Sequence, residues 1–313
     1  MLEHGSQCLT GSTHVLGVIG DPILHSLSPA MQNAALQALD MDYIYVPFHV
    51  SPFHVEEAIA GVKALGIKGI NVTIPHKVAV MGYLDQIDSV AELIGAVNTV
   101  NNEKGYLMGY NTDGYGFLRS LEEEANRKPE GQNVVILGAG GSARAIGFQL
   151  ALSKIRSLVI ANRTESRAVA LAAEIHAKTR CPTVGTGLDQ LDAYLSTTDI
   201  IINTTSLGMY PQVDTMPPVE IDLLPSCTLV CDIVYNPSET LFLRKAAASG
   251  RATLRGLGML AHQGAAALEI WLQVKAPIDV MKDALRKQLG GNRCYATKEA
   301  GNEDSKELGG GLS

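Results

Sequence analysis

The sequence predicts a protein of two α/β domains, and three observations support that prediction. A chain of 313 residues exceeds the size that one hydrophobic core fills comfortably, so two domains are the default expectation. Apolar residues make up 46% of the chain and charged residues 18%, which is typical of a compact α/β protein. Apolar, β-branched runs alternate with segments of helical period, and this alternation indicates parallel β–α units.

The first part of the chain carries the signals of one such domain. Ser28 and Ser51 are each expected to cap a helix, because a proline follows both and is tolerated in the first helical turn. The second of these helices is expected to run to Leu65 and to stop at Gly66, which readily adopts a left-handed conformation. The expected strands are short apolar runs bounded by turn residues, at 15–19, 43–46, 67–72, 96–101 and 105–110.

The later part predicts a second α/β block followed by two helices. A helix is expected to end near Leu152, another spans 240–249, and Gly250 closes the block. An alanine-rich helix through Trp271 and a last helix at 277–289 are expected to pack back on the first domain. The expected strands of this block lie at 133–137, 158–161, near 183, 200–203 and 229–234.

Composition excludes several classes of protein. The net charge of −7 argues against nucleic acid as a partner, because binding to a phosphate backbone needs an excess of Lys and Arg. No apolar stretch approaches the roughly 20 residues that span a bilayer, and no signal peptide is recognisable, so a cytoplasmic location and no membrane partner are expected. The five cysteines lack the paired spacing of zinc or redox sites, and no metal is predicted: Cys8, Cys181, Cys227, Cys231 and Cys294.

A glycine-rich turn follows the strand at 133–137. Its glycines would let the backbone approach a pyrophosphate at a helix N-terminus, as in a dinucleotide-binding turn. The motif alone is weak, but here it follows an apolar strand and opens a helical pattern, which is the context of a true site. The predicted cofactor-binding residues of the turn are Gly138, Gly140, Gly141, Ser142 and Ala143.

The residues after the next strand favour NADP over NAD. An NAD site usually has an acidic residue about 20 positions after the turn, where it binds the ribose 2′-hydroxyl. Here the strand leads into Asn162, Arg163 and Thr164, with Arg167 one helical turn later, and two guanidinium groups suit a 2′-phosphate. Glu165 is the alternative, as a partner for a free 2′-hydroxyl.

Polar residues gather at several places in the first domain. Ser26 and Ser28 lie beside a helix N-terminus, which suits a carboxylate, although Ser28 could serve only as a cap. The segment from Asn71 through Thr73 to Lys77 ends a strand with an amide, a hydroxyl and an ammonium. Two further segments add the amide of Asn98 and the carboxylate of Asp113.

These segments, in this order, resemble the shikimate dehydrogenase family. The resemblance covers roughly residues 15–289 and continues in the second domain. The matching later segments are Asn203-Thr204-Thr205-Ser206-Leu207-Gly208-Met209, Asp232-Ile233-Val234-Tyr235-Asn236-Pro237, and Gly256-Leu257-Gly258-Met259-Leu260 with Gln263. The resemblance implies reversible reduction of 3-dehydroshikimate to shikimate with NADPH, a step of aromatic amino-acid biosynthesis.

The resemblance also implies roles for individual residues. Lys77 would be the general acid and base, with Asp113 orienting it. The substrate carboxylate would be held by Ser26, Ser28 and Tyr235, and its hydroxyls by Asn71, Thr73, Asn98 and Gln263. Further cofactor contacts would come from Thr204, Met209, Ile233, Gly256 and Met259, with Gly258 beside Met209 at the nicotinamide.

The implied organisation has an N-terminal substrate-binding domain with a mainly parallel sheet and a Rossmann NADP-binding domain. The first spans residues 14–114, completed by 256–290, the second spans 115–255, and flexible ends are expected at 1–13 and 291–313. Residues 113–116 are expected to form a hinge. The hinge glycines are Gly114, Gly116, Gly256 and Gly258.

Two other functions stay open on the sequence. The segment Met31-Gln32-Asn33 departs from the family's usual His-Asn pair and resembles quinate/shikimate dehydrogenases, which oxidise quinate and often prefer NAD. A catalytically silent NADPH-binding regulatory module would also keep the fold, but it would not need both Lys77 and Asp113. Histidines next to the motifs, such as His25, are expected to be ordinary loop or helix residues, and a homodimer is the one assembly considered.

Overall fold

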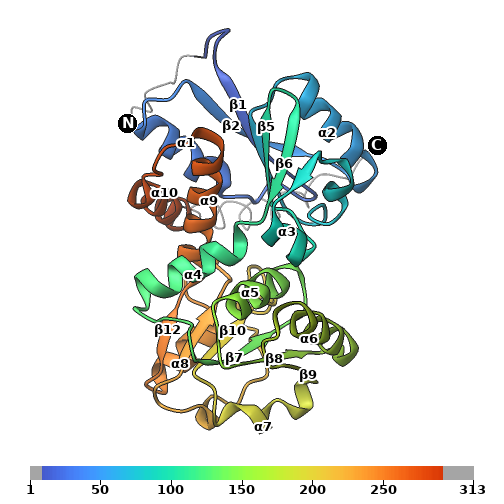
Figure 1. The fold of residues 1–313 in the computed structure, drawn as a ribbon. Helices are drawn as coiled ribbons and strands as arrows, with labels where there is room; N and C mark the ends of the chain where they lie inside the picture. Colours follow the sequence, from blue (N-terminus) through green and yellow to red (C-terminus); the bar gives the residue numbers. More distant parts are fainter. Residues whose placement is uncertain (1–8, 292–313) are drawn as a thin grey trace, which may run out of the picture.

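The computed structural model describes residues 9–291 and consists of two lobes stacked end to end (Figure 1). Of the flexible ends predicted at 1–13 and 291–313, residues 1–8 and 292–313 lie outside the described residues. Ser12 and Thr13 donate hydrogen bonds to Asp42, at 2.9 and 2.7 Å, just before the first strand. Within residues 9–291, no helix has both the length and the apolar character needed to cross a membrane.

The first lobe is built on a six-stranded sheet in the order β2-β1-β3-β5-β6-β4. All neighbouring strands are parallel except for β5, which is antiparallel to both β3 and β6. Consequently the carboxyl ends of β1, β3 and β6 and the start of β5 share one edge of the sheet. The strands are β1 (His14–Gly20), β2 (Tyr43–His49), β3 (Gly69–Val72), β4 (Gln86–Ile87), β5 (Thr99–Glu103) and β6 (Tyr106–Tyr110).

Helices from both ends of the chain cover this sheet. Helices α1 (Ser28–Ala38), α9 (Gly256–Leu272) and α10 (Ile278–Gly291) share one core with β1 and β2. Helix α2 (Val55–Ala64) packs on the opposite face. The prediction that the last helices return to the first domain is therefore confirmed, and in Figure 1 the red C-terminal helices lie beside the blue α1.

The second lobe is a Rossmann fold. Its sheet is entirely parallel, in the order β12-β11-β10-β7-β8-β9, so the direction of winding reverses between β7 and β10. Ligands of such folds bind outside the carboxyl ends of the strands at this switch point. The strands are β7 (Asn133–Leu137), β8 (Ser157–Asn162), β9 (Thr183–Gly187), β10 (Ile200–Asn203), β11 (Leu229–Asp232) and β12 (Ala252–Leu254).

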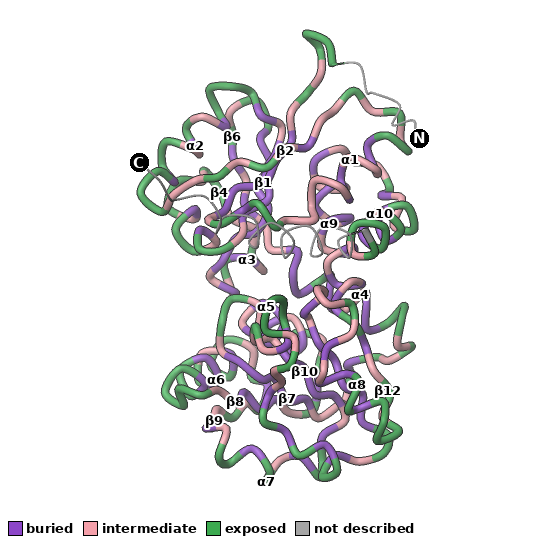
Figure 2. Tube along the Cα trace, turned by 180° about the vertical axis from the view of Figure 1, so that it is seen from behind, coloured by how far each residue is buried: buried purple, intermediate pink, exposed green. Residues whose placement is uncertain are grey.

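Helices cover both faces of this second sheet, and its central strands β7, β8, β10 and β11 are largely buried between them (Figure 2). Helices α5 (Gly141–Leu152) and α6 (Glu165–Thr179) cover one face, and α7 (Asp192–Leu195) and α8 (Leu241–Ala248) cover the other. The lobes meet where α4 (Asp113–Glu124) packs along α9. A second meeting point brings the short helix α3 (Ser89–Ile94) of the first lobe against α5.

Two local predictions were wrong. Residues 113–116 form the first turn of α4 rather than a hinge, because Asn111 accepts a hydrogen bond from the Asp113 N–H and starts the helix. The Ser28 side chain does not cap α1: Leu27 occupies the cap position, and Ser26 Oγ accepts from the Ser28 N–H at 3.3 Å.

The four glycines expected to act as hinges lie inside α4 and α9. A Cβ at Gly116 would lie 2.7 Å from the Gln263 nitrogen, and one at Gly114 would lie 2.7 Å from the Ala145 carbonyl. A Cβ at Gly256 would likewise clash with the Ile233 carbonyl, and one at Gly258 with the Glu124 side chain. Their small size therefore allows close packing of helices.

Candidate active site

The edge where β1, β3 and β6 end collects the polar residues of the first lobe. The loop after β1 carries Ser26, the loop after β3 carries Lys77, and the segment after β6 leads to Asp113. The Asp21 N–H donates to the Ile74 carbonyl at 3.0 Å, which holds the first two loops together. Segments far apart in the sequence therefore meet at one site.

Lys77 and Asp113 form an ion pair at this edge. Lys77 Nζ donates to Asp113 Oδ2 at 2.6 Å, and the side chains are only 20% and 10% exposed. Charge-assisted hydrogen bonds of this kind strengthen as water is excluded. The pair supplies an ammonium proton donor whose position is fixed by a carboxylate.

Asn98 supports the other oxygen of Asp113. Its Nδ2 donates to Asp113 Oδ1 at 2.8 Å and to Thr112 Oγ1 at 3.0 Å. Its Oδ1 accepts from the Thr112 N–H at 2.8 Å and from Thr99 Oγ1 at 2.9 Å. Every polar atom of the Asn98 amide is therefore engaged within the protein, and this residue acts on the site through Asp113.

Asn71 is similarly held at the end of β3. Its Nδ2 donates to the Asn98 carbonyl at 3.2 Å and to Thr99 Oγ1 at 3.1 Å. Its Oδ1 accepts a hydrogen bond from Tyr45 at 2.7 Å, and the residue is 7% exposed. Since both amide hydrogens are used, the remaining capacity of Asn71 is a lone pair on Oδ1.

The other predicted substrate residues surround this edge or face it from later elements. Ser26, Ser28 and Thr73 are half-buried in the loops after β1 and β3. Gln263 lies on α9 and packs against Gly116 in the first turn of α4, and Gly116 is three residues after Asp113 in the sequence. Tyr235 is half-buried in the loop after β11, and burial raises the pKa of its hydroxyl.

The glycine-rich turn has the geometry of a phosphate-binding turn. Gly138 has a φ of +110°, and a Cβ there would lie 2.8 Å from Thr204 Oγ1, so only glycine fits. Gly140 and Gly141 have open space on the side where a Cβ would point, at the N-terminus of α5. Ser142 and Ala143 continue the first turn of α5, whose N–H groups are available to an anion.

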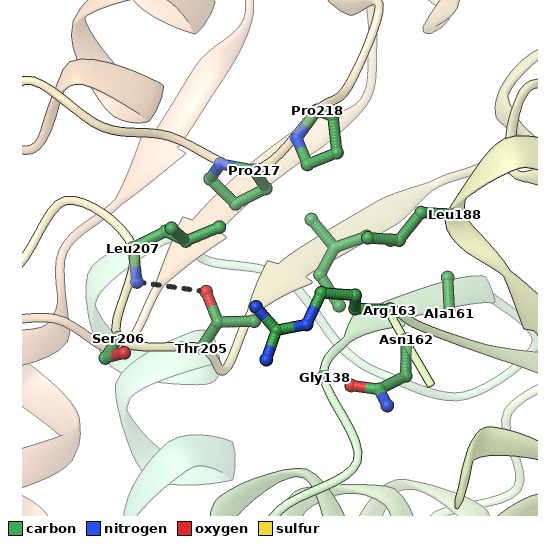
Figure 3. Close-up of a pocket in the computed structure, with 11 residues that line it drawn as sticks. Gly138, Ala161, Asn162, Arg163, Leu188, Thr205, Ser206, Leu207, Pro217 and Pro218 are labelled. Carbon is green, nitrogen blue, oxygen red and sulfur yellow. Dashed lines mark hydrogen bonds between the residues drawn. The ribbon is translucent and has the colours of Figure 1, made fainter. Parts of the chain in front are cut away.

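A pocket of about 260 Å³ lies beside this turn at the switch point. Asn162 and Arg163 at the end of β8 line it, with Gly138 below (Figure 3). Thr164, which precedes α6, and Arg167, in its first turn, are exposed and are not among the residues that line the pocket. Thr205, Ser206 and Leu207 also line the pocket; they belong to a segment that resembles the family, but the sequence predicted no cofactor contact for them. Leu188, Pro217 and Pro218 line it from connecting segments without a motif.

The remaining predicted cofactor residues lie at the strand ends and loops of the second lobe, except for Gly256 and Met259 on α9. Thr204 donates to the Leu137 carbonyl at 2.7 Å and ties β10 to β7, and Met209 is 46% exposed in the following loop. Ile233 is half-buried and its carbonyl contacts Gly256. Met259 is 8% exposed and belongs to the core under α4, so it packs between the lobes.

Two of the histidines next to the motifs, His76 and His262, have structural neighbours. His76 is 1% exposed, and its Nε2 lies 2.6 Å from the Val50 carbonyl. His262 lies 3.3 Å from Glu123 between α4 and α9, and burial lowers its pKa. Among residues 9–291, no three His, Cys, Asp or Glu side chains are grouped so that they could hold a metal ion.

Three family models match the chain. The shikimate dehydrogenase substrate-binding domain matches residues 18–100, the shikimate/quinate 5-dehydrogenase model matches 120–210, and the shikimate 5′-dehydrogenase C-terminal domain matches 256–286. The chain belongs to the shikimate dehydrogenase family. The first match includes Lys77, and the second includes the glycine turn and Arg163; Asp113 lies in the segment between them.

Curated shikimate dehydrogenases (NADP(+)) are similar over most of their length. The enzyme of Desulforamulus reducens is 45% identical, covering 90% of this chain and 97% of its own. That of Methanocaldococcus jannaschii is 48% identical, covering 88% and 98%.

Solved structures of the family share the fold. A shikimate dehydrogenase in complex with NADP⁺ has a TM-score of 0.84 and 46% identity, over 90% of this chain and 98% of the other. The Listeria monocytogenes enzyme, in complex with shikimate and NAD, has a TM-score of 0.83 and 38% identity over 88% and 98%. The Corynebacterium glutamicum quinate dehydrogenase, in complex with NAD, has a TM-score of 0.82 and 30% identity, over 88% of this chain and 99% of the other.

Proposed function

We propose that this protein is an NADP-dependent shikimate dehydrogenase, which reversibly reduces 3-dehydroshikimate to shikimate in aromatic amino-acid biosynthesis. The observation that carries the proposal is the Lys77–Asp113 pair at 2.6 Å on the lobe opposite a Rossmann pocket lined by Arg163. The identity of 45–48% to curated NADP-dependent relatives supports the same reaction.

The residues of the second lobe suit a dinucleotide that carries a 2′-phosphate. The pyrophosphate would lie against Gly140 and Gly141, where a Cβ would meet open space, with the N-terminus of α5 behind them. Arg163 would pair with the 2′-phosphate, and a role for Arg167 beside it is part of the same proposal. The bound nicotinamide would supply the hydride in reduction and accept it in oxidation.

Lys77 would handle the proton of the reaction. As the ketone carbon gains hydride, negative charge develops on its oxygen, and the Lys77 ammonium would stabilise that charge and donate a proton to the oxygen. In the reverse direction neutral Lys77 would accept the hydroxyl proton. Asp113 would hold Lys77 in place and keep its position fixed through both directions.

The substrate's carboxylate and hydroxyls would be recognised by the surrounding polar groups. Ser26, Ser28 and Tyr235 would hold the carboxylate, and Thr73 and Gln263 would bind hydroxyls. Asn71 would accept a hydrogen bond from a hydroxyl at Oδ1, because its two amide hydrogens are already donated. Asn98 would contribute by orienting Asp113. A site that pairs each hydroxyl discriminates against analogues that lack one.

A steady-state comparison of shikimate and quinate, each with NADP⁺ and NAD⁺, tests this function. The proposal predicts the highest kcat/KM for shikimate with NADP⁺. Quinate with NAD⁺ as the best pair would instead establish the quinate/shikimate alternative that the Met31-Gln32-Asn33 segment favours. Binding of NADPH without turnover of either acid would establish a silent regulatory module.

We also propose the working organisation of the chain. Residues 14–114 with 256–290 would bind the substrate, and residues 115–255 would bind the cofactor. We further propose that the protein acts in the cytoplasm as a homodimer. Light scattering coupled to size-exclusion chromatography would give twice the chain mass for the dimer, and the chain mass would contradict it.

A further inference from the structure

A buried tyrosine that belongs to none of the sequence motifs described above reaches the candidate active site. Tyr45 lies on β2, is 1% exposed, and packs its ring near Trp271, with the centroids 6.1 Å apart. Its hydroxyl extends across the sheet and donates to Asn71 Oδ1 at 2.7 Å. A phenylalanine would fill the same space in the core, so packing does not require the hydroxyl.

Asn71 connects Tyr45 to β5 through its own hydrogen bonds. Its Nδ2 donates to Thr99 Oγ1 at 3.1 Å, and Thr99, which is completely buried, donates to Asn98 Oδ1 at 2.9 Å. Asn98 in turn donates to Asp113 Oδ1 at 2.8 Å. A continuous series of side-chain hydrogen bonds therefore connects the core tyrosine to the carboxylate that holds Lys77.

The donors and acceptors of these hydrogen bonds can be arranged in only one direction along the series. The carboxylate of Asp113 can only accept, so Asn98 must present its NH₂ group to it and its oxygen to Thr99. Thr99 must then donate to Asn98 and accept from Asn71, which leaves the Asn71 oxygen facing Tyr45. Every donor points toward Asp113, and such aligned bonds strengthen one another in a buried site.

The Tyr45 hydroxyl is suited to remain a donor. Burial raises its pKa well above the ordinary value, against the smaller effect of a hydrogen bond from Ser28. Asn98 has an additional anchor, since its Oδ1 also accepts from the Thr112 N–H. Loss of the Tyr45 hydroxyl would therefore act first on Asn71, whose oxygen has no other donor within the described chain.

We infer that Tyr45 is a positioning residue for the dehydrogenase reaction. Its hydroxyl fixes the orientation of the Asn71 amide. In that orientation the amide oxygen can accept a hydrogen bond from a substrate hydroxyl, and the amide NH₂ group supports the Thr99–Asn98–Asp113 series. The inference rests on the proposed function, because it assigns Asn71 and Asp113 to the substrate side.

The kinetic test uses substitutions that remove one hydroxyl and little volume. Tyr45→Phe and Thr99→Val are each expected to lower kcat/KM for shikimate by about tenfold, because a buried partner is left unpaired. The KM for NADP⁺ should stay within twofold of wild type. Thr99→Ser, which keeps the hydroxyl, should restore activity to within about threefold of wild type.

A matched control separates positioning from fold stability. Thr228 is also completely buried and donates to the Thr198 carbonyl at 2.6 Å, at the opposite end of β11 from the candidate site. Thr228→Val should lower thermal stability as Tyr45→Phe does, but it should leave kcat/KM unchanged. Equal kinetic losses in both variants, or a Tyr45→Phe enzyme within twofold of wild type, would overturn the inference.

A second readout does not depend on turnover. In protein labelled with ¹⁵N-asparagine, the side-chain NH₂ signals of Asn71 and Asn98 are expected to exchange slowly with solvent. Tyr45→Phe should speed exchange at Asn71 by at least tenfold, whereas Thr228→Val should not. If wild type turns over neither shikimate nor quinate, the proposed function fails. The positioning role of Tyr45 fails separately, if Tyr45→Phe leaves the exchange rate of the Asn71 NH₂ group unchanged.

Discussion

We propose that Arg163 is the residue on which the choice of cofactor depends. It lines the pocket at the switch point, whereas Arg167 on α6 does not. Arg163→Ala should therefore raise the KM for NADPH about 10- to 100-fold, which corresponds to the loss of about 1.5–3 kcal/mol for a charge-assisted contact. The KM for NADH should change less than threefold.

Arg167→Ala is the matched comparison, because it removes a second guanidinium four residues later, in the first turn of α6. Steady-state kinetics of both variants with both cofactors give the answer. Equal losses for NADPH and NADH in Arg163→Ala would show that this side chain does not recognise the 2′-phosphate.

Much of the site could be predicted at the level of single residues, because its motifs contain residue types whose chemistry or backbone conformation indicates a specific role. The ion pair of Lys77 with Asp113 is one such case, as is Gly138, where φ and the contact with Thr204 exclude any other residue. Tyr45 could not be found in this way, since an aromatic residue in a strand pattern indicates only core packing. The hydroxyl's partner lies on another strand, and only the register of β1, β2 and β3 brings them together.

At the scale of elements, Asp232 joins the loops that follow β10 and β11. It accepts hydrogen bonds from Asn203 at 3.0 Å, from the Val234 N–H at 3.0 Å and from Thr240 at 2.7 Å. Asn203 also donates to the Leu207 carbonyl at 3.2 Å. One buried carboxyl therefore fixes the pocket loop and the start of α8.

Asp232 makes a specific contribution to the pH dependence of stability. Burial raises its pKa from 3.8 to about 6, so between these values the folded state holds a proton that the unfolded state has released. This group's contribution to stability is therefore greatest below pH 4 and falls as the pH rises to 6, by about 3 kcal/mol in all. Asp232→Asn should remove that dependence.

Urea unfolding of wild type and Asp232→Asn at several pH values between 4 and 7 measures the effect. The difference between the two proteins isolates Asp232, because other carboxyls titrate equally in both. The variant should gain in relative stability as the pH rises through this range. A difference that is constant with pH would show that the pKa of Asp232 is not raised.

The order of β and α elements could be predicted, but some local elements could not. The strand at 133–137, the end of α5 and the stop at Gly66 follow from apolar runs and glycine chemistry. Helix α3, with six residues, is too short to show a helical period. Residues 113–116 contain two glycines, which favoured a hinge, yet packing against α9 and the Asn111 bond make them helical.

At the scale of the whole molecule, two cations hold the lobes together on the side away from α9. Arg144 of α5 donates to the Ile94 carbonyl, and Lys178 of α6 donates to the Leu93 carbonyl at 3.0 Å. These carbonyls end α3, where the helix dipole favours positive charge. Arg144 also hydrogen-bonds Glu174 and lowers the pKa of that carboxyl to about 2, so Glu174 stays ionised at neutral pH.

The double substitution Arg144→Met and Lys178→Met should loosen this contact. We expect the free energy of unfolding to fall by about 1–2 kcal/mol, since both cations are partly exposed. Solution X-ray scattering should give a larger radius of gyration than that of wild type. Arg180→Met, which removes a cation from the end of the same helix, is the control. A scattering profile identical to wild type would contradict this role.

The central claim is that Lys77, on one lobe, transfers the proton while the other lobe presents the cofactor. The most direct measurement is kcat for shikimate oxidation by Lys77→Ala, together with the Kd for shikimate. Lys68→Ala is the control, because Lys68 pairs with Glu103 at the opposite end of β3. The account predicts that Lys77→Ala lowers kcat by about 10²- to 10⁴-fold and changes the Kd less than tenfold, with Lys68→Ala near wild type. An unchanged kcat in Lys77→Ala would contradict it.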